Sequence, residues 1–253
     1  MQQTYKPWVL CDADDTLIGA VLNGQVVGTS VVYEHTKALF GEEMAKIGFS
    51  VEESRTAQRE IDFEKCREIG FSKLWRHPLT FRLAYKKMCQ RYNIKSDQEI
   101  ARALERVGFS VFDYVAVAFP GALEALEALR QHYRIAIVTK GDAEHQRKKL
   151  AQAGFRANDY PVVIMSHKDT REWRQRVIRS LRIGNQERQL SWAVGDSIKS
   201  DINPPLELGF SAVHVNTFSW AFEQAQYGVV SPDATLRVVS SIGEVPEHIL
   251  CSA

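Results

Sequence analysis

Short apolar runs rich in β-branched residues alternate with amphipathic segments along much of the chain. Most of these runs are followed by a polar turn and then by a helical pattern. The runs that predict buried strands are residues 8–11, 134–138, 162–165, 192–194, 212–215 and 235–239. This alternation is typical of βαβ units, so we predict an α/β fold with a Rossmann-like parallel sheet and helices on both faces. Ligands of such sheets bind at the carboxyl ends of the strands, where polar residues follow each run.

One long segment interrupts the alternation. More than a hundred residues with little strand character separate the first run from the second, and helical patterns cover 34–47, 52–69, 80–92 and 97–106. We therefore predict an α-helical cap domain at residues 21–117, inserted into a core domain formed by residues 1–20 and 118–253. An Asn-Gly pair at Asn23 and Gly24 predicts a hairpin turn. We place the hinge into the cap there.

Composition limits the function more than the fold. The apolar fraction of 45% is enough for a buried core, and the formal net charge of +1 argues against a general nucleic-acid binder. The basic segment 171–182 is the main support for the alternative, a nucleic-acid or anionic-partner binding module. Its apolar positions recur at helical spacing, which favours a surface helix packed on the sheet.

The compartment is also constrained by composition. The apolar stretches are too short to cross a bilayer, so we expect no membrane association. The four cysteines show no paired spacing typical of a zinc site or a disulfide framework, which suits a reducing cytoplasm. The sequence makes no prediction of the oligomeric state.

Three carboxylates crowd the end of the first predicted strand, in Asp12-Ala13-Asp14-Asp15-Thr16-Leu17. Such groups resist simultaneous ionisation unless a cation neutralises them, and Mg²⁺ is the usual cation beside phosphate. The alternative is structural, since aspartates also form turns and cap helices.

Three further polar clusters follow later strands, at residues 139–142, 166–169 and 195–201. Thr139 can bind a phosphate oxygen, or it can cap the next helix. Lys168 can supply a compact positive charge for phosphate, or it can be a solvated surface lysine. Asp196 can be a second metal carboxylate, while Asp201 can orient Lys168 or cap a short helix.

In this order the clusters resemble the four motifs of the haloacid-dehalogenase superfamily. Its first motif, Asp-x-Asp-x-Thr-Leu, is matched by Asp12, Asp14, Thr16 and Leu17. Its strand-end Thr, its Lys and its Gly-Asp followed by a further Asp are matched by Thr139, Lys168, Gly195, Asp196 and Asp201. The inserted helical segment is similar to the superfamily's first cap type, found in capped phosphatases.

This resemblance implies a Mg²⁺-dependent phosphatase that hydrolyses a small phosphorylated metabolite through an aspartyl-phosphate. Asp12 would be the nucleophile, and Asp14 the general acid and then the base. Mg²⁺ would bind Asp12, Asp196 and the backbone carbonyl of Asp14. The phosphate would be held by Thr139 and Lys168, with Lys140 beside them, and Asp201 and Ser197 would support the site.

Other reactions fit the motifs to different degrees. The superfamily's dehalogenases lack an acid at the position of Asp14, which makes carbon–halogen cleavage a poor fit. Phosphomutases share all four motifs and stay open. The motifs of cysteine phosphatases, serine hydrolases and P-loop nucleotide binders are absent. Substrate choice would fall to the cap, with the candidates His35, Arg55, Arg59, Arg76, His77 and Arg82.

Overall fold

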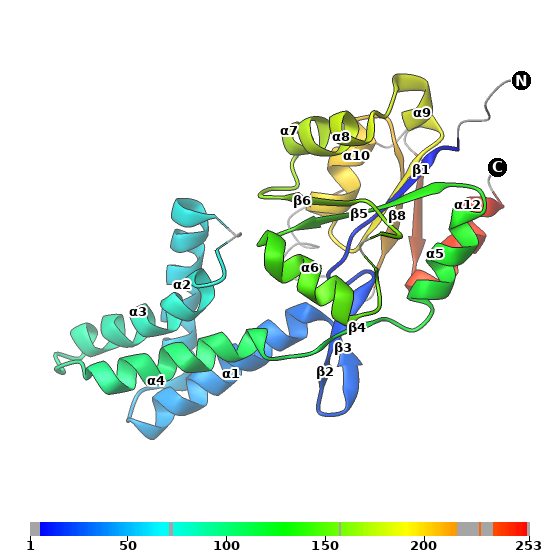
Figure 1. Cartoon of the computed structure of the whole chain (residues 1–253). Coiled ribbons are helices and arrows are strands. Elements are labelled where there is room, and N and C mark those ends of the chain that lie inside the picture. The colour runs from blue at the N-terminus through cyan, green and yellow to red at the C-terminus, as the bar shows by residue number, and fades with distance from the viewer. Residues whose placement is uncertain (1–5, 71–72, 157, 217–227, 229–234, 252–253) are drawn as a thin grey trace, which may run out of the picture. The chain divides into compact units, whose positions relative to one another are not determined.

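The protein consists of two compact units in a computed structural model, which describes residues 6–70, 73–156, 158–216, 228 and 235–251 (Figure 1). The first unit comprises residues 1–29 and 115–253, and the second comprises residues 30–114. Each unit has its own hydrophobic core.

A six-stranded parallel sheet forms the centre of the first unit. Its order is β6-β5-β1-β7-β8-β9. The strands are β1 (Trp8–Cys11), β5 (Arg134–Lys140), β6 (Val162–Met165), β7 (Trp192–Gly195), β8 (Ser211–Val215) and β9 (Leu236–Val239). All six predicted runs are strands, and the predicted parallel α/β fold is confirmed.

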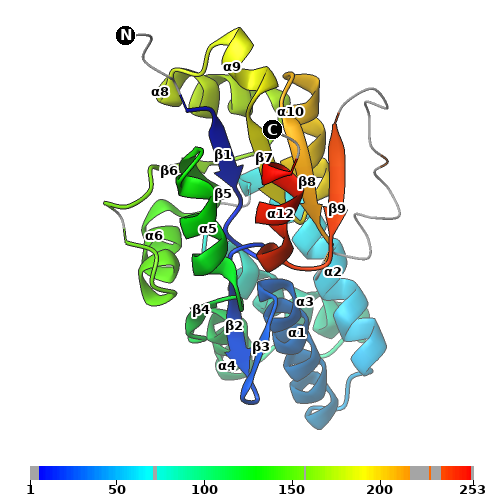
Figure 2. The same ribbon diagram turned by 90° about the vertical axis from the view of Figure 1, so that its right-hand side faces the viewer.

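Helices cover both faces of this sheet, as predicted. On one face α5 (Ala122–Arg130) and α12 (Val245–Leu250) lie side by side, and α6 (Ala143–Gln152) packs on the same core (Figure 2). The other face is covered by the segment 170–181 and by α10 (Asn203–Glu207). Successive residues of β1 point to opposite faces of the sheet. Val9 packs in the hydrophobic cluster on the face covered by α5 and α12, and Leu10 packs in the cluster on the other face. A short α9 (Asn185–Gln189) precedes β7.

The basic segment 171–182 packs through its apolar positions. It comprises α7 (Thr170–Glu172), a π-helical turn (Trp173–Ile178) and α8 (Arg179–Leu181). Trp173 and Val177 are buried in the core of the second face, and the Trp173 indole N–H donates to the carbonyl of Ser200 at 3.0 Å. The segment is therefore a helix packed on the sheet.

A small antiparallel sheet, in the order β3-β2-β4, also belongs to the first unit. It contains β2 (Ile18–Leu22), β3 (Gln25–Val27) and β4 (Ala116–Ala118). The predicted hairpin joins β2 to β3, with φ of 52° at Asn23 and 78° at Gly24, as a tight hairpin turn needs. The predicted cap boundary differs here, because residues 21–29 and 115–117 fall in the first unit. The reason is that β4 returns to pair with β2, which ties both ends of the insertion into one sheet.

The second unit is built from helices. They are α1 (Thr29–Lys46, whose first residue belongs to the first unit), α2 (Val51–Ile69), α3 (Arg76–Arg91), α4 (Gln98–Phe109) and a 3₁₀ turn (Ser110–Phe112). Ser50 caps α2 and Asp97 caps α4 through their side-chain oxygens. The apolar faces meet in a core that includes Phe40, Met44 and Phe81.

Several residues suggested as substrate-contacting are engaged inside this helical unit. Arg55 pairs with Glu34, Arg76 with Asp62, and Arg82 with Glu105. His77 is buried beside Thr36, at 3.4 Å between Nε2 and Oγ1. Across the described part of both units, every helix is too short or too polar to span a membrane.

Candidate active site

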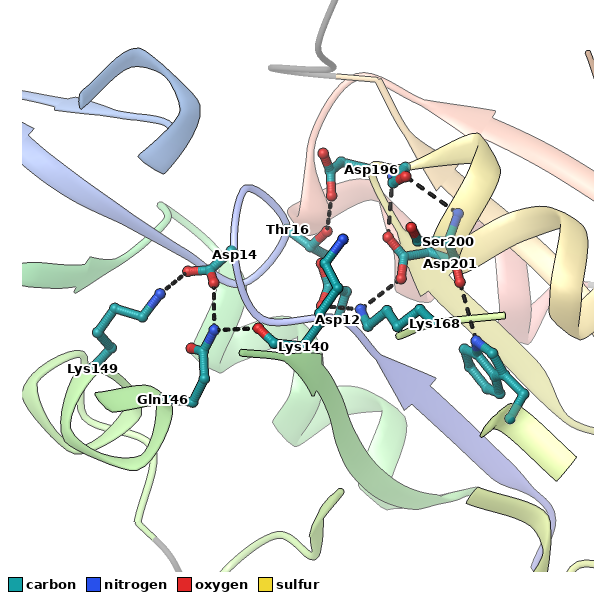
Figure 3. A network of polar contacts seen from close by, with 12 residues as sticks. Asp12, Asp14, Thr16, Lys140, Gln146, Lys149, Lys168, Asp196, Ser200 and Asp201 are labelled. Carbon is teal, nitrogen blue, oxygen red and sulfur yellow. Dashed lines mark hydrogen bonds and ion pairs between the residues drawn. The ribbon is translucent and has the colours of Figure 1, made fainter. Parts of the chain in front are cut away.

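Polar side chains gather where four neighbouring strands end. Because β6, β5, β1 and β7 are parallel and adjacent, their carboxyl ends share one edge of the sheet. Asp12 directly follows β1, and its backbone N–H donates to the carbonyl of Val194 at 2.8 Å. Lys140 ends β5, Lys168 follows β6, and Asp196 follows β7. The fold thus brings together the four sequence clusters that lie far apart along the chain (Figure 3).

Lys168 is the cation at the centre of this site. Its ammonium donates to Asp201 Oδ1 at 2.6 Å and to Asp12 Oδ1. Its side chain is only 3% exposed, so the surface-lysine alternative is wrong. Burial alone would lower the pKa of Lys168, but attraction by Asp12 and Asp201 outweighs it and raises that pKa. Lys168 therefore remains charged and unsuited to act as a nucleophile.

Negative charge is in excess around this lysine. Carboxylate oxygens of Asp12, Asp196 and Asp201 all lie within 4.8 Å of one another. Burial, followed by repulsion from Asp201, raises the pKa of Asp12 to about 7, although Lys168 pulls it down. Burial and repulsion from Asp201 and Asp12 also hold the pKa of Asp196 well above its usual range. One lysine does not neutralise three carboxylates, and a hard divalent cation would relieve the remaining repulsion.

Asp201 is the carboxylate least suited to hold such a cation. Its Oδ1 accepts from Lys168 at 2.6 Å, and its Oδ2 accepts the backbone N–H of Ser197 at 3.1 Å. Asp12 and Asp196 are therefore the side chains that fit a metal, while Asp201 holds Lys168 in place.

The turn after β7 explains how Asp201 reaches the site. Ser197 caps the following π-helical turn (Ile198–Ile202), because its hydroxyl accepts the N–H of Ser200 at 3.2 Å. The cap is thus Ser197 and not Asp201, which the sequence had offered as the structural alternative. Gly195 leaves room for Asp201: a Cβ at this position would lie 2.3 Å from the Cβ of Asp201. The chain then restarts as α10 with two prolines in its first turn.

Two more groups contact Asp196. The hydroxyl of Thr16 donates to its Oδ1 at 3.4 Å, and Nε2 of His214 lies 2.8 Å from its backbone carbonyl. Thr16 was a motif match without an assigned role. His214 was missed, since a single histidine within the apolar run of β8 carries no signal of a contact 18 residues away.

The other two aspartates of the first cluster have different partners. Asp14 accepts Lys149 Nζ at 2.5 Å and Gln146 Nε2 at 2.8 Å, both from α6. Burial would raise the pKa of Asp14, but Lys149 and Gln146 hold it below its usual range. In Figure 3 the Asp14 side chain points toward these two groups, whereas the Asp12 carboxylate faces Lys168. The sequence did not predict a role for Gln146 or Lys149. The only signal for them is their i, i+3 spacing, which places both on one face of the helix.

Asp15 has a structural role. It adopts a left-handed backbone conformation with φ of 62°, and its Oδ1 accepts the hydroxyl of Thr29 at 2.8 Å and the Thr29 backbone N–H. It therefore satisfies donors at the first turn of α1. The structural alternative raised for the whole first cluster is correct for this residue.

Thr139 and Lys140 close the site on the side of β5. Thr139 is buried at the end of the strand. It does not cap α6, because Asp142 does so by accepting the N–H of His145 at 2.9 Å. The carbonyl of Lys140 accepts Gln146 Nε2 at 2.7 Å, which fixes the turn between β5 and α6.

Comparison with known proteins agrees with this arrangement. The chain matches the family of haloacid dehalogenase-like hydrolases over residues 67–237, more than half of its length. It belongs to this family. The protein is therefore a hydrolase of the haloacid dehalogenase-like type, as the motif order indicated. The cluster around Asp12 precedes the matched segment, so its assignment rests on the site geometry.

The individual proteins that this chain resembles have low sequence identity to it. The chain is 27% identical over 139 residues to the pyrimidine 5′-nucleotidase YjjG of Escherichia coli (strain K12), a match that spans 54% of this chain and 58% of that protein. A haloacid dehalogenase-like family hydrolase from Xanthomonas campestris has a similar structure, with a TM-score of 0.74 and 19% identity over 98% of this chain and 96% of the other. L-2-haloacid dehalogenase from Xanthobacter autotrophicus superposes with a TM-score of 0.56 and 16% identity, over 98% and 100%. These two structures share the fold.

Proposed function

We propose that this hydrolase is a Mg²⁺-dependent phosphatase that cleaves a small phosphomonoester, with Asp12 as its nucleophile. The observation that carries the proposal is the buried pairing of Asp12 with Lys168, beside a second carboxylate, Asp196, that Lys168 leaves unneutralised. This arrangement combines a nucleophile, a cation for phosphate oxygens and a place for a divalent ion.

The reaction proceeds in two displacements. An oxygen of Asp12 bonds to phosphorus while the bond from phosphorus to the leaving oxygen breaks, and Asp14 gives that oxygen a proton. Water then attacks phosphorus and passes a proton to Asp14, and the bond between phosphorus and Asp12 breaks to release inorganic phosphate. Lys168 and Thr139 hold phosphate oxygens throughout, and Asp201 keeps Lys168 in place.

The carboxylates present fit a magnesium ion. Asp12 and Asp196 would hold it, with the backbone carbonyl of Asp14, and all three are the hard oxygen donors that Mg²⁺ prefers. When bound, the ion supplies positive charge that offsets the repulsion between an anionic nucleophile and an anionic substrate.

The residues present favour a phosphatase over dehalogenation, and they leave phosphoryl transfer within a substrate as an alternative. Halide leaves a carbon atom without needing a proton, so a dehalogenase has no use for Asp14. An alkoxide leaving group does need a proton, which Asp14 can give. A phosphomutase would use the same groups and is the alternative within the family. It would transfer the phosphoryl group to a second substrate position, whereas a phosphatase releases inorganic phosphate.

The similarity to a pyrimidine 5′-nucleotidase makes pyrimidine nucleoside 5′-monophosphates the first natural substrates to test. We propose that the helical unit 30–114 acts as the inserted cap that selects among such small metabolites. We expect neither a nucleic acid nor a membrane as partner.

Asp12→Asn tests the proposal directly. We expect p-nitrophenyl phosphate hydrolysis, measured as released phosphate, to require Mg²⁺, to stop with EDTA, and to fall by about 10³-fold or more in this variant. Asp15→Asn is the matched control, because its amide oxygen can still accept from Thr29 and it should remain active. Asp12→Asn activity near that of the wild type would rule out a covalent role for Asp12.

A further inference from the structure

The Asp14 carboxylate is engaged on both of its oxygens. Lys149 Nζ lies 2.5 Å from Oδ1, and Gln146 Nε2 lies 2.8 Å from Oδ2. Both donors come from α6, four and seven residues after the Asp142 that caps this helix. The carboxylate is thus tied to one helix and, in Figure 3, directed away from the Asp12–Lys168 pair.

One of the two donors is fixed in position. Gln146 is only 4% exposed, and its amide nitrogen also donates to the carbonyl of Lys140 at 2.7 Å. Gly141 packs closely against it, since a Cβ there would lie 3.0 Å from Gln146 Nε2. Gln146 is therefore held by the turn between β5 and α6 and cannot follow Asp14 elsewhere.

The second donor is longer and more accessible. The Lys149 side chain is 15% exposed, and that of Asp14 is 27% exposed. Solvent reaches both side chains and screens their attraction, so this contact is weaker than a fully buried ion pair and can break within a catalytic cycle.

We propose that Lys149 and Gln146 form a resting seat for Asp14, which its carboxylate must leave in order to protonate the leaving group. Lys149 is then a positioning residue that acts through Asp14. This inference rests on the proposed phosphatase function, in which Asp14 transfers the proton. Breaking the contact with Lys149 opposes protonation of the leaving oxygen, and a leaving group that needs this proton is the one that is slowed.

Leaving groups of different basicity separate this role from a structural one. p-Nitrophenolate departs without a proton, whereas an alkyl alcohol such as a nucleoside requires one. The value of kcat/KM covers the steps up to formation of the aspartyl-phosphate, so it excludes the later hydrolysis that both substrates share.

The experiment compares kcat/KM for a pyrimidine nucleoside 5′-monophosphate and for p-nitrophenyl phosphate. In Lys149→Met we expect the ratio of the first to the second to rise about 2- to 5-fold, the factor that a partly exposed ion pair provides. Lys149→Arg keeps the charge and should leave the ratio near that of the wild type. Lys148→Met makes the same charge change at an exposed position of α6 and should also leave it unchanged.

A variant of Asp14 shows whether Lys149 acts through it. In an Asp14→Asn background, adding Lys149→Met should no longer alter the ratio. The proposal is wrong if Lys149→Met leaves the ratio unchanged or lowers it. It is also wrong if Lys149→Met raises the ratio equally in the Asp14→Asn background. If Lys149 instead bound phosphate, both kcat/KM values would fall together, which also overturns it.

Thermal unfolding tests the contact between Lys149 and Asp14 independently of catalytic activity. Lys149→Met and Asp14→Asn should lower the Tm non-additively, so that the double variant loses less than the sum of the single losses. Additive losses would contradict the contact. A wild-type protein inactive on both esters would refute the proposed phosphatase, while this cycle would still decide whether the seat exists.

Discussion

Gly195→Ala is the substitution whose consequence the structure defines most sharply. A methyl group at this position would lie 2.3 Å from Cβ of Asp201, 2.6 Å from its Cγ and 2.8 Å from its Oδ2. Separations below about 3 Å do not occur between such atoms, so β7 or Asp201 must shift. Asp201 is buried, and it is held by Lys168 and by the N–H of Ser197, so a shift breaks or weakens these bonds.

The expected loss of folding stability in Gly195→Ala has two parts. Overpacking a tight interior costs about 1–3 kcal/mol, and losing a hydrogen bond to a charged partner costs about 1.5–3 kcal/mol. A combined loss of about 3 kcal/mol corresponds to a Tm decrease of roughly 6–12 °C for a protein of this size. Because Asp201 holds Lys168 beside Asp12, we also expect kcat/KM for p-nitrophenyl phosphate to fall roughly tenfold or more.

Gly243→Ala is the matched control for this substitution. A Cβ there meets its nearest atoms at 3.8 and 4.0 Å, so the methyl group fits without displacement. Thermal denaturation and steady-state kinetics of both variants provide the comparison. If Gly195→Ala were as stable and as active as Gly243→Ala, the close approach of Asp201 to the end of β7 would not be what orders this site.

The remaining predictions concern pH and metal. Burial, aided by the positive charges of Lys37 and Arg76, lowers the pKa of His77 to about 3, so this histidine stays neutral in the folded helical unit while it charges in the unfolded chain near pH 6.5. Its contribution to stability is therefore complete above about pH 6.5 and is lost as the pH falls toward 3. Between neutral pH and pH 5 the free energy of unfolding of the wild type should therefore fall by about 2 kcal/mol more than that of His77→Gln. Urea unfolding at the two pH values measures this difference, and an equal fall in both proteins would contradict the prediction. Mg²⁺ at about 100 times its dissociation constant should stabilise the wild type by about 2.7 kcal/mol, visible as a higher Tm, and Asp196→Asn should abolish most of the increase. An equal increase in both proteins would place the metal elsewhere.

The strands and their polar ends could be predicted because each depends on local sequence. A run such as residues 8–11 is apolar on both faces, which only a strand buried between two layers of helices accommodates. Parallel strands place their carboxyl ends at one edge, so the gathering of Asp12, Lys168 and Asp196 followed from chain order. The helical segment between the first two strands was also legible from its periodicity.

The separate roles of Asp12, Asp14 and Asp15 could not be predicted in full, because these three aspartates differ only in which partners the fold brings to them. Asp12 meets Lys168 from another strand end, while Asp15 meets Thr29 and serves the start of α1. The boundary of the insertion was misplaced for a related reason. Nothing in the local sequence of Ala116–Ala118 shows that these residues pair with β2 across about a hundred residues of sequence.

By itself, the sequence determined the α/β architecture, the order of the motifs and the residue types available for chemistry, because hydrophobic period and strand-end position are local properties. The tertiary structure alone decided which of those groups touch. It buried Lys168 between two carboxylates, placed Asp201 against Gly195, and seated Asp14 on α6 between Gln146 and Lys149. Distances between side chains on different elements depend on packing over the whole sheet, and these distances set the charge balance of the site.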